Sequence, residues 1–104
     1  MDVVILETCR KELSSFPSEV IEDFTDAVAK LSVGLRLKMP LSKDMSSVAR
    51  GVHELRIKDR SGQFRVIYLI KKKDAIYMIH AFRKKTQKTP KKNIDLALKR
   101  IRRL

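Results

Sequence analysis

Residues 52–82 read VHELRIKDRSGQFRVIYLIKKKDAIYMIHAF, and this segment predicts three consecutive β-strands. In Val52–Lys58 apolar and polar residues alternate, which is typical of a strand with one buried face. Gln63–Ile70 is apolar at nearly every position except Arg65, and Ala75–Phe82 is similar, as expected of strands covered on both faces. The connections DRSG and KKKD are short enough for hairpins, so we expect a three-stranded antiparallel meander.

The segments on either side of the meander predict one further strand and three helices. Asp2–Leu6 is a short β-branched run that is typical of a buried strand. The next two predicted elements are a helix over Glu7–Ser15 and a helix that begins at Pro17, and we expect them to form a hairpin. A third helix begins at Thr89 and Pro90, as N-cap and first residue. Leu35–Gly51 has no clear period and is expected to be a loop, so the predicted class is α+β with about four strands.

Charge is distributed unevenly along the chain. The formal net charge of the 104 residues is +12. Residues 1–50 carry 7 basic and 8 acidic side chains, whereas residues 51–104 carry 17 basic and 4 acidic ones. This asymmetry favours a polyanionic partner, either a nucleic acid or an acidic protein.

Several kinds of site and location are disfavoured. Cys9 is the only cysteine, so no internal disulfide can form, and its spacing from Leu13 and Phe16 predicts a buried thiol. No set of histidine, cysteine or carboxylate residues has metal-ligand spacing, and no glycine-rich phosphate loop is present, so we expect neither a metal nor another cofactor. No apolar run approaches the roughly 20 residues that span a bilayer. We also recognise no signal peptide, so we expect a cytoplasmic protein without membrane contact.

Basic side chains cluster where the last predicted strand ends. Residues 83–92 include six basic side chains and no acidic one, which builds a local positive field. Hairpin pairing would bring Arg56 and Lys58 to within about 5 Å of Arg65, the one charge inside its strand. A buried guanidinium needs a counter-charge, so either Glu54 pairs with Arg65 or Arg65 faces a bound anion. Spacing alone leaves both alternatives open.

Clustered cations allow chemistry on RNA as well as binding. A pentavalent phosphorane carries extra negative charge, which guanidinium groups stabilise. Cleavage also needs a base for the 2′-OH and an acid for the leaving 5′-oxygen. A lysine beside another cation can have a lowered pKa, so Lys58, Lys84 and Lys85 are candidates for proton transfer. A metal-free ribonuclease is therefore allowed, although a basic patch is more often a binder than an enzyme.

This chain resembles the phage-derived Gp49-like branch of the RelE/HigB toxin superfamily in two blocks, ELRIKDRSGQFRVIYLIKKKD (Glu54–Asp74) and IHAFRKKTQKTPKK (Ile79–Lys92). The resemblance covers residues 17–104 in element order, and its motifs lie in residues 54–92. It implies a single toxin domain over residues 1–104. The implied fold is a twisted antiparallel sheet, flanked by an N-terminal helical hairpin and a C-terminal helix.

The resemblance also implies an activity and two partners. Members of the superfamily are small bacterial toxins of type II toxin–antitoxin pairs. The best-known members cut mRNA in the ribosomal decoding site without metal, through attack of the 2′-OH on the adjacent phosphate. The expected partners are mRNA on the ribosome and a cognate antitoxin with a helix-turn-helix DNA-binding domain. One alternative is a non-catalytic RNA- or ribosome-binding module on the same scaffold, and another is an interaction protein that docks on an acidic partner.

Site residues follow from the same resemblance. Arg65 matches the arginine that contacts the scissile phosphate, and Arg56 and Lys58 match the basic strand before it. Arg83 matches the basic residue that follows the last strand. We therefore expect catalytic roles for Arg56, Arg65, Arg83 and Lys85. We expect RNA binding by six further cations, Lys58, Arg60, Lys84, Lys88, Lys91 and Lys92.

The chain differs from several relatives near its C-terminus. Those relatives use a tyrosine or histidine there for RNA stacking or proton transfer, whereas neither residue type follows Phe82 here. His80 has the opposite strand parity to Arg83, so we expect it to pack in the sheet rather than act as a base. Tyr68 and Tyr77 are expected in the core, as is Phe82. The general base therefore stays unassigned.

Overall fold

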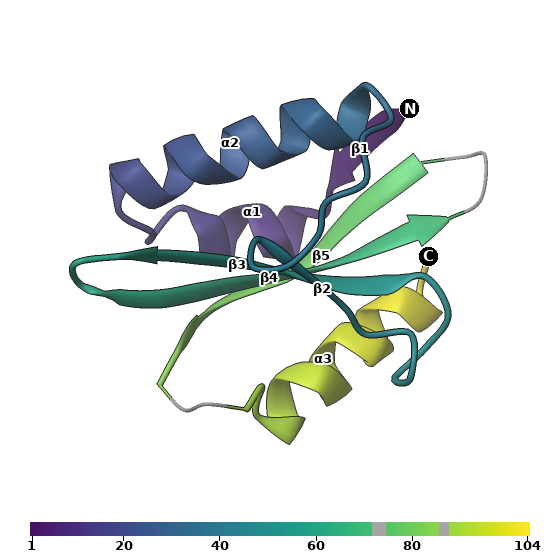
Figure 1. The fold of residues 1–104 in the computed structure, drawn as a ribbon. Helices are drawn as coiled ribbons and strands as arrows, with labels where there is room; N and C mark the ends of the chain where they lie inside the picture. The colour runs from purple at the N-terminus through teal and green to yellow at the C-terminus, as the bar shows by residue number, and fades with distance from the viewer. Residues whose placement is uncertain (72–74, 86–87) are drawn as a thin grey trace.

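Five strands and three helices make up the fold in a computed structural model, which describes residues 1–71, 75–85 and 88–104 (Figure 1). The predicted KKKD turn falls largely on residues 72–74, which lie outside the described part, as do residues 86–87. In chain order the elements are β1 (Asp2–Ile5), α1 (Glu7–Leu13), α2 (Ser18–Ser32), β2 (Ser42–Asp44), β3 (Val52–Asp59), β4 (Gly62–Lys71), β5 (Ala75–Lys84) and α3 (Lys91–Arg102).

The strands form one sheet in the order β1-β5-β4-β3-β2. The predicted antiparallel meander is confirmed, since β3 pairs with β4 and β4 with β5 in that sense. Two expectations are wrong. The sheet has five strands rather than about four, because residues 42–44 of the predicted loop form β2 against β3. It is also mixed, because β1 pairs with β5 in parallel.

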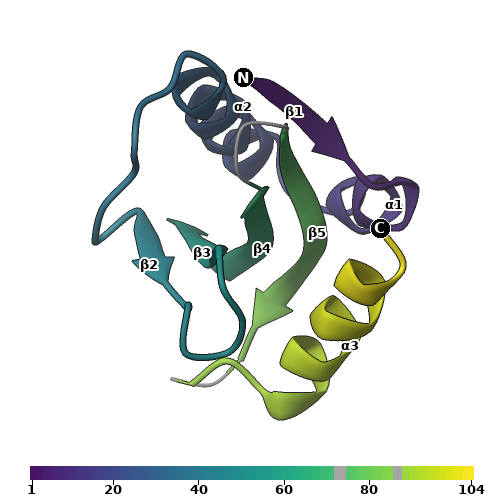
Figure 2. The same cartoon turned by 90° about the vertical axis from the view of Figure 1, so that its right-hand side faces the viewer.

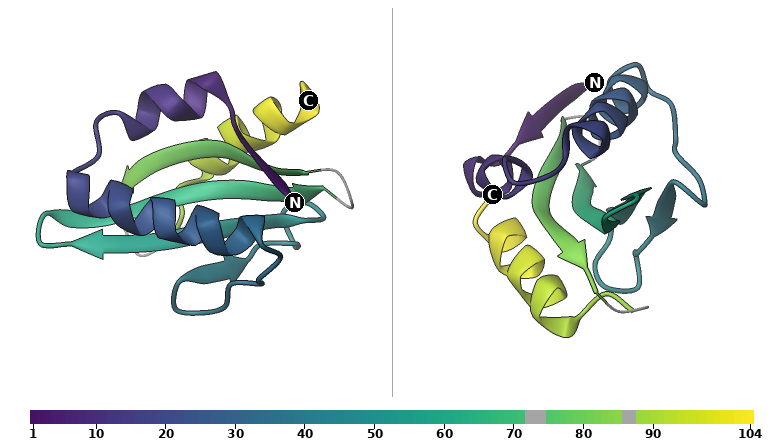
Figure 3. Two further views of the ribbon diagram at one scale, coloured as in Figure 1. Left: turned by 90° about the horizontal axis from the view of Figure 1, so that it is seen from above. Right: turned by 90° about the vertical axis from the view of Figure 1, so that its left-hand side faces the viewer.

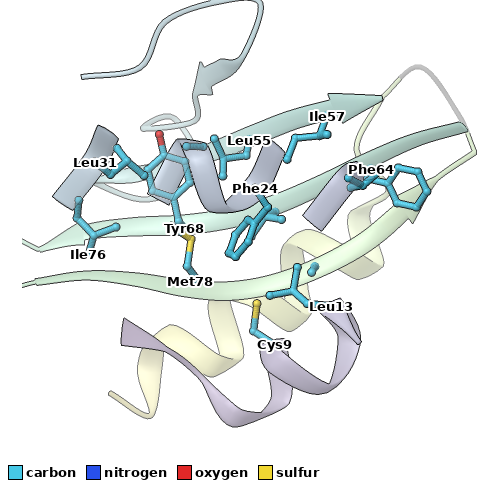
Figure 4. Close-up of a cluster of buried hydrophobic side chains, with 14 residues drawn as sticks. Cys9, Leu13, Phe24, Leu31, Leu55, Ile57, Phe64, Tyr68, Ile76 and Met78 are labelled. Carbon is cyan, nitrogen blue, oxygen red and sulfur yellow. The ribbon is translucent and has the colours of Figure 1, made fainter. Parts of the chain in front are cut away.

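Helices cover the sheet on both faces (Figure 2). On the first face, which we call the α1/α2 face, both N-terminal helices pack on side chains of the central strands. Figure 4 shows the helix residues Cys9, Leu13, Phe24 and Leu31 gathered over the sheet residues Leu55, Tyr68 and Met78. The second face, the α3 face, buries Val52, Ile67, Leu69, Ile79 and Phe82 together with Ala97 of α3. Cys9 is fully buried, as expected, and burial raises the pKa of its thiol to about 12.

The N-terminal helices contact different strands, which differs from the predicted hairpin. α1 packs against β5, whereas α2 packs against β3 and β1 (Figure 3). Because β1 ends at Ile5, one edge of the second half of β5 has no partner strand, whereas the other edge pairs with β4. The carboxylate of Glu12 in α1 accepts a hydrogen bond from the backbone N–H of Ala81 there, at 3.1 Å. A helix therefore completes the edge of the sheet that a strand would otherwise cover.

Glu12 also joins α1 to α3. The guanidinium of Arg100 donates to both Glu12 oxygens, at 2.8 and 3.1 Å, and to the carbonyl oxygen of Ile79 at 3.0 Å. His80 Nδ1 lies 2.9 Å from Glu12, and His80 Nε2 lies 2.7 Å from the side-chain oxygen of Asn93 in α3. These contacts hold the two helices on opposite sides of the end of β5.

Candidate functional site

The cationic cluster lies on the α3 face, over β2, β3, β4 and the end of β5. Strand register brings these side chains together. Arg56 of β3 lies opposite Arg65 of β4, and Lys43 of β2 lies opposite Glu54, which is on the same face of β3 as Arg56. Lys84 pairs with Gln63 on the neighbouring strand, so it points to the same face. α3 packs against β5 and does not extend over β3 and β2 (Figure 2). We define the cationic cluster as Lys43, Arg56, Arg65 and Lys84.

Glu54 is the carboxylate at the centre of the cluster. Its side chain is fully buried. Its Oε1 lies 3.4 Å from Nε of Arg56 and 3.5 Å from Nε of Arg65. Thr89 donates its hydroxyl hydrogen to the other oxygen of Glu54. A single buried carboxylate therefore holds two guanidinium groups side by side, which mutual repulsion would otherwise separate.

Arg65 resolves the question that spacing left open. Glu54 is its counter-charge, and the side chain of Arg65 is nonetheless part of the basic face, since it directly opposes Arg56. Its Nη2 donates to Oε1 of Gln63 at 3.0 Å. Its Nε is buried and donates no hydrogen bond to any described residue. Burial lowers the pKa of Arg65, Glu54 opposes that shift and Arg56 adds to it.

Lys84 is a buried lysine within the cluster. Only 7% of its surface is exposed. Burial lowers the pKa of its ammonium group, and the positive charges of Arg65, Arg56 and Lys43 add to this effect while Glu54 opposes it. Loss of a proton from Lys84 is therefore easier than from an ordinary surface lysine.

Arg83 does not join this cluster, contrary to the predicted convergence of Arg56, Arg65 and Arg83. We expected Arg83 to lie just after the strand, but β5 continues to Lys84. Successive residues of a strand point to opposite faces, so Arg83 pairs with Phe64 and points to the α1/α2 face. Its guanidinium lies 5.5 Å from the centre of the Phe64 ring and donates to the carbonyl oxygen of Ser61. Of the two neighbouring cations that we expected at the site, Lys84 therefore faces the cluster and Arg83 does not.

The other cations that we expected at the site are exposed on the elements and turns that carry the cluster or follow it in the chain. Lys58 is exposed on β3 on the same face as Arg56, and Arg60 is exposed in the turn that follows. Lys85 is exposed just beyond β5. The remaining three, Lys88, Lys91 and Lys92, are exposed before and at the start of α3. Lys91 forms an ion pair with Asp95 at 2.7 Å.

Three residues at the site have no counterpart in the sequence-based prediction. Lys43 was missed because β2 was taken for a loop, and Gln63 because its role depends on the register of β4. Thr89 was expected to cap α3, but its hydroxyl group binds Glu54 and the N-cap residue is Pro90. The residue pattern Thr-Pro is compatible with either role, so only the fold distinguishes them.

The buried aromatic and histidine side chains are where the sequence predicted them. His80 is only 4% exposed and stacks on Phe82, with ring centres 5.0 Å apart. Tyr68 is buried, and its hydroxyl oxygen lies 2.7 Å from that of Ser42. Tyr77 packs partly buried against the α3-face core. None of these rings lies open beside the cationic cluster.

Two searches of the described residues returned nothing. Residues 1–71, 75–85 and 88–104 hold no group of three or more His, Cys, Asp or Glu side chains arranged to bind a metal ion. In the same ranges, each helix is too short or too polar to cross a lipid bilayer.

Known proteins resemble this chain in sequence and in fold. Residues 11–102 match the family described as phage-derived protein Gp49-like. The structure is similar to that of the Escherichia coli toxin RelE, solved in the free state as a double arginine-to-alanine mutant, with a TM-score of 0.56 and 17% sequence identity. That match covers 99% of this chain and 96% of RelE, and at this identity it shows the fold alone. No curated protein matches the sequence. The chain belongs to the phage-derived Gp49-like family, as its two sequence blocks indicated, and it has a RelE-like fold.

Proposed function

We propose that this protein is the toxin of a type II toxin–antitoxin system and that it cuts mRNA on the ribosome without a metal ion. The observation that carries the proposal is the cationic cluster, in which two arginines and two lysines share one face of the sheet around one buried carboxylate. The membership in the Gp49-like family and the RelE-like fold support the assignment.

The cluster suits the cleavage of an RNA phosphodiester. The 2′-oxygen attacks the adjacent phosphorus while the bond from phosphorus to the 5′-oxygen breaks, which yields a 2′,3′-cyclic phosphate and a free 5′-OH. Negative charge increases on the phosphate in the transition state, where preorganised guanidinium groups stabilise it. We assign this role to Arg56 and Arg65. Glu54 contacts both and acts as the positioning residue.

Proton transfer is assigned to Lys84. The 2′-OH must lose a proton and the leaving 5′-oxygen must gain one. Burial and neighbouring cations lower the pKa of Lys84, which increases the fraction of its amine that is neutral and able to accept a proton. Lys58 and Lys85 remain the alternatives, since both are exposed near the same end of the sheet.

The proposal also includes an antitoxin as partner and the cytoplasm as location. We infer that the protein binds a small antitoxin with a helix-turn-helix DNA-binding domain, and that both act in the cytoplasm, where translating ribosomes supply the substrate. We assign binding of the RNA backbone to four exposed cations, Arg60, Lys88, Lys91 and Lys92.

Primer extension on a translated mRNA tests the activity. We expect induction of the protein to stop growth and to produce new 5′ ends within coding regions. The same ends should be absent when the start codon of the reporter mRNA is mutated, because ribosomes then do not load. Growth arrest without any new 5′ ends would reject the nuclease and favour a non-catalytic ribosome-binding module.

A further inference from the structure

A cavity of about 520 Å³ lies beside the cationic cluster, at the edge of β3 that β2 leaves uncovered. This volume is in the range of pockets that hold small ligands, about 300–1,000 Å³. One wall carries the cations Arg56, Lys58 and Arg65 together with Gln63, and the opposite wall belongs to α2. Arg56 and Arg65 therefore face both the cavity and the proposed reaction site.

The α2 wall presents two carboxylates. Asp23 and Asp26 are three residues apart, so they lie on the same side of the helix, beside the buried stripe of Phe24 and Ala27. Both are exposed, and within the described ranges neither carboxylate forms an ion pair or a side-chain hydrogen bond. They are open to a ligand that donates hydrogen bonds.

Apolar side chains form the middle of the cavity. Leu41, Pro40 and Ile57 line it between the cationic wall and the acidic wall. The α2 wall also carries Lys30, so the cavity offers cations at one end, an apolar middle, and two carboxylates beside one lysine at the other. A nucleotide has the matching order of groups, namely a phosphate, a flat ring and an edge with N–H donors.

Arg65 connects the cavity to the cationic cluster, because it belongs to both. Its side chain is more than nine-tenths buried and lines the cavity, and its Nε, which donates no hydrogen bond to a described residue, lies 3.5 Å from the carboxylate of Glu54. An anion held between Arg56 and Arg65 would place the rest of its molecule in the cavity.

We propose that the cavity binds the base of the nucleotide next to the scissile phosphate, and that Asp23 and Asp26 select guanine. The proposal rests on the proposed function and adds a base preference to it. Guanine presents two adjacent donors on its Watson–Crick edge, N1–H and the 2-amino group, which one carboxylate accepts together. Adenine, cytosine and uracil each present a single donor group on that edge, and so does hypoxanthine.

Binding of nucleoside 3′-monophosphates to the purified protein tests the preference without requiring cleavage. By calorimetry we expect 3′-GMP to bind about fivefold more tightly than 3′-IMP, which lacks only the 2-amino group. Fivefold is the low end of the range for a bidentate pair, as suits a partly solvated site. 3′-AMP, 3′-CMP and 3′-UMP should bind like 3′-IMP.

Paired variants separate base recognition from general electrostatics. In Asp23→Asn/Asp26→Asn, the ratio of 3′-GMP to 3′-IMP affinity should fall to about one, while 3′-UMP should bind as well as before or better because negative charge is lost. Glu19→Gln/Glu22→Gln makes the same charge change on the same helix outside the cavity and should keep the ratio. Equal binding of 3′-GMP and 3′-IMP by the unmodified protein would overturn the proposal, as would an unchanged ratio in the first variant or no nucleotide binding at all.

The outcome is independent of the test for cleavage. New 5′ ends without a guanosine preference would leave the nuclease in place and reject the base pocket. A guanosine preference without new 5′ ends would keep the pocket and reject the nuclease.

Discussion

At the scale of single residues, Glu54 is the side chain on which the candidate site most depends. Its full burial, with Arg56 and Arg65 as neighbours, means that removal of its charge leaves two guanidinium groups uncompensated. Breaking a buried ion pair by removing one partner costs about 3–5 kcal/mol. A glutamine keeps one hydrogen-bond acceptor, so we expect Glu54→Gln to lower the free energy of unfolding by about 3 kcal/mol. Chemical denaturation measures this value.

Asp95 provides the matched control, because Asp95→Asn also converts a carboxylate to an amide. Its ion pair with Lys91 is exposed, with 54% and 87% of the two side chains accessible. Exposed pairs of this kind contribute less than about 1 kcal/mol. Equal loss of stability in the two variants would contradict the central role of Glu54.

The sequence identified Glu54 and Arg65 as candidate site residues. It did not determine whether Arg65 pairs with Glu54 or faces a bound anion. Alternation within residues 52–58 correctly put Glu54 and Arg56 on the same face. Whether a carboxylate reaches across to the next strand depends on side-chain conformation and on Thr89, which is far away in sequence. Contacts of that kind have no local signature.

At the scale of elements, the length of β5 determines which cations meet. The apolar pattern ends at Phe82, so the sequence predicted that the strand ends there as well. Pairing with Gln63 extends the strand to Lys84, and this extension sends Arg83 and Lys84 to opposite faces. Strand ends are set by the partner strand rather than by local hydrophobicity, which is why this prediction failed.

β2 was missed for a related reason. Its three residues, Ser42–Asp44, are short and mostly polar, and they are extended because β3 offers them a partner. Ser42 is buried, with its hydroxyl next to that of Tyr68. No periodicity can be read from three residues, so Lys43 could not be placed at the site in advance.

The junction of α1, β5 and α3 predicts a pH dependence of stability. Burial alone would raise the pKa of Glu12, but hydrogen bonds from Arg100 and His80 lower it below its ordinary value of 4.5. A carboxylate with a lowered pKa in the folded state stabilises the protein above its ordinary pKa, and this contribution is lost as the pH falls through the folded value. At neutral pH we expect Glu12→Gln to cost about 2 kcal/mol, as for hydrogen bonds to charged groups.

Unfolding at a series of pH values checks this expectation. The difference in unfolding free energy between the unmodified protein and Glu12→Gln should be constant near neutral pH and should shrink steadily below pH 4.5. Glu19→Gln, on the exposed part of α2, should show little difference at any pH. A difference for Glu12→Gln that persists undiminished in acid would mean that packing, and not the charge of Glu12, joins the elements.

At the scale of the whole molecule, the uneven charge of the sequence corresponds to particular elements of the fold. The second half of the chain holds most of the basic residues, and it supplies β3, β4 and β5 with their turns and α3. The first half supplies β1, β2 and the helices of the α1/α2 face. The class, the meander and the family were predictable from the sequence, because they depend on alternation, short turns and two long motifs. The face of the sheet on which each cation lies depends on the pairing register of the strands, and this register could not be predicted from the sequence.

The most direct test compares two arginines that lie on opposite faces of the same sheet. Arg65→Gln removes a charge from the cationic cluster and keeps a polar side chain near Glu54, whereas Arg83→Gln makes the same change on the α1/α2 face. Thermal unfolding should first establish that both variants are folded. In cells, we expect Arg65→Gln to abolish growth arrest and the new 5′ ends in mRNA, and Arg83→Gln to retain most of both. Full cleavage by Arg65→Gln, or loss of cleavage only in Arg83→Gln, would contradict the assignment of the reaction to the α3 face.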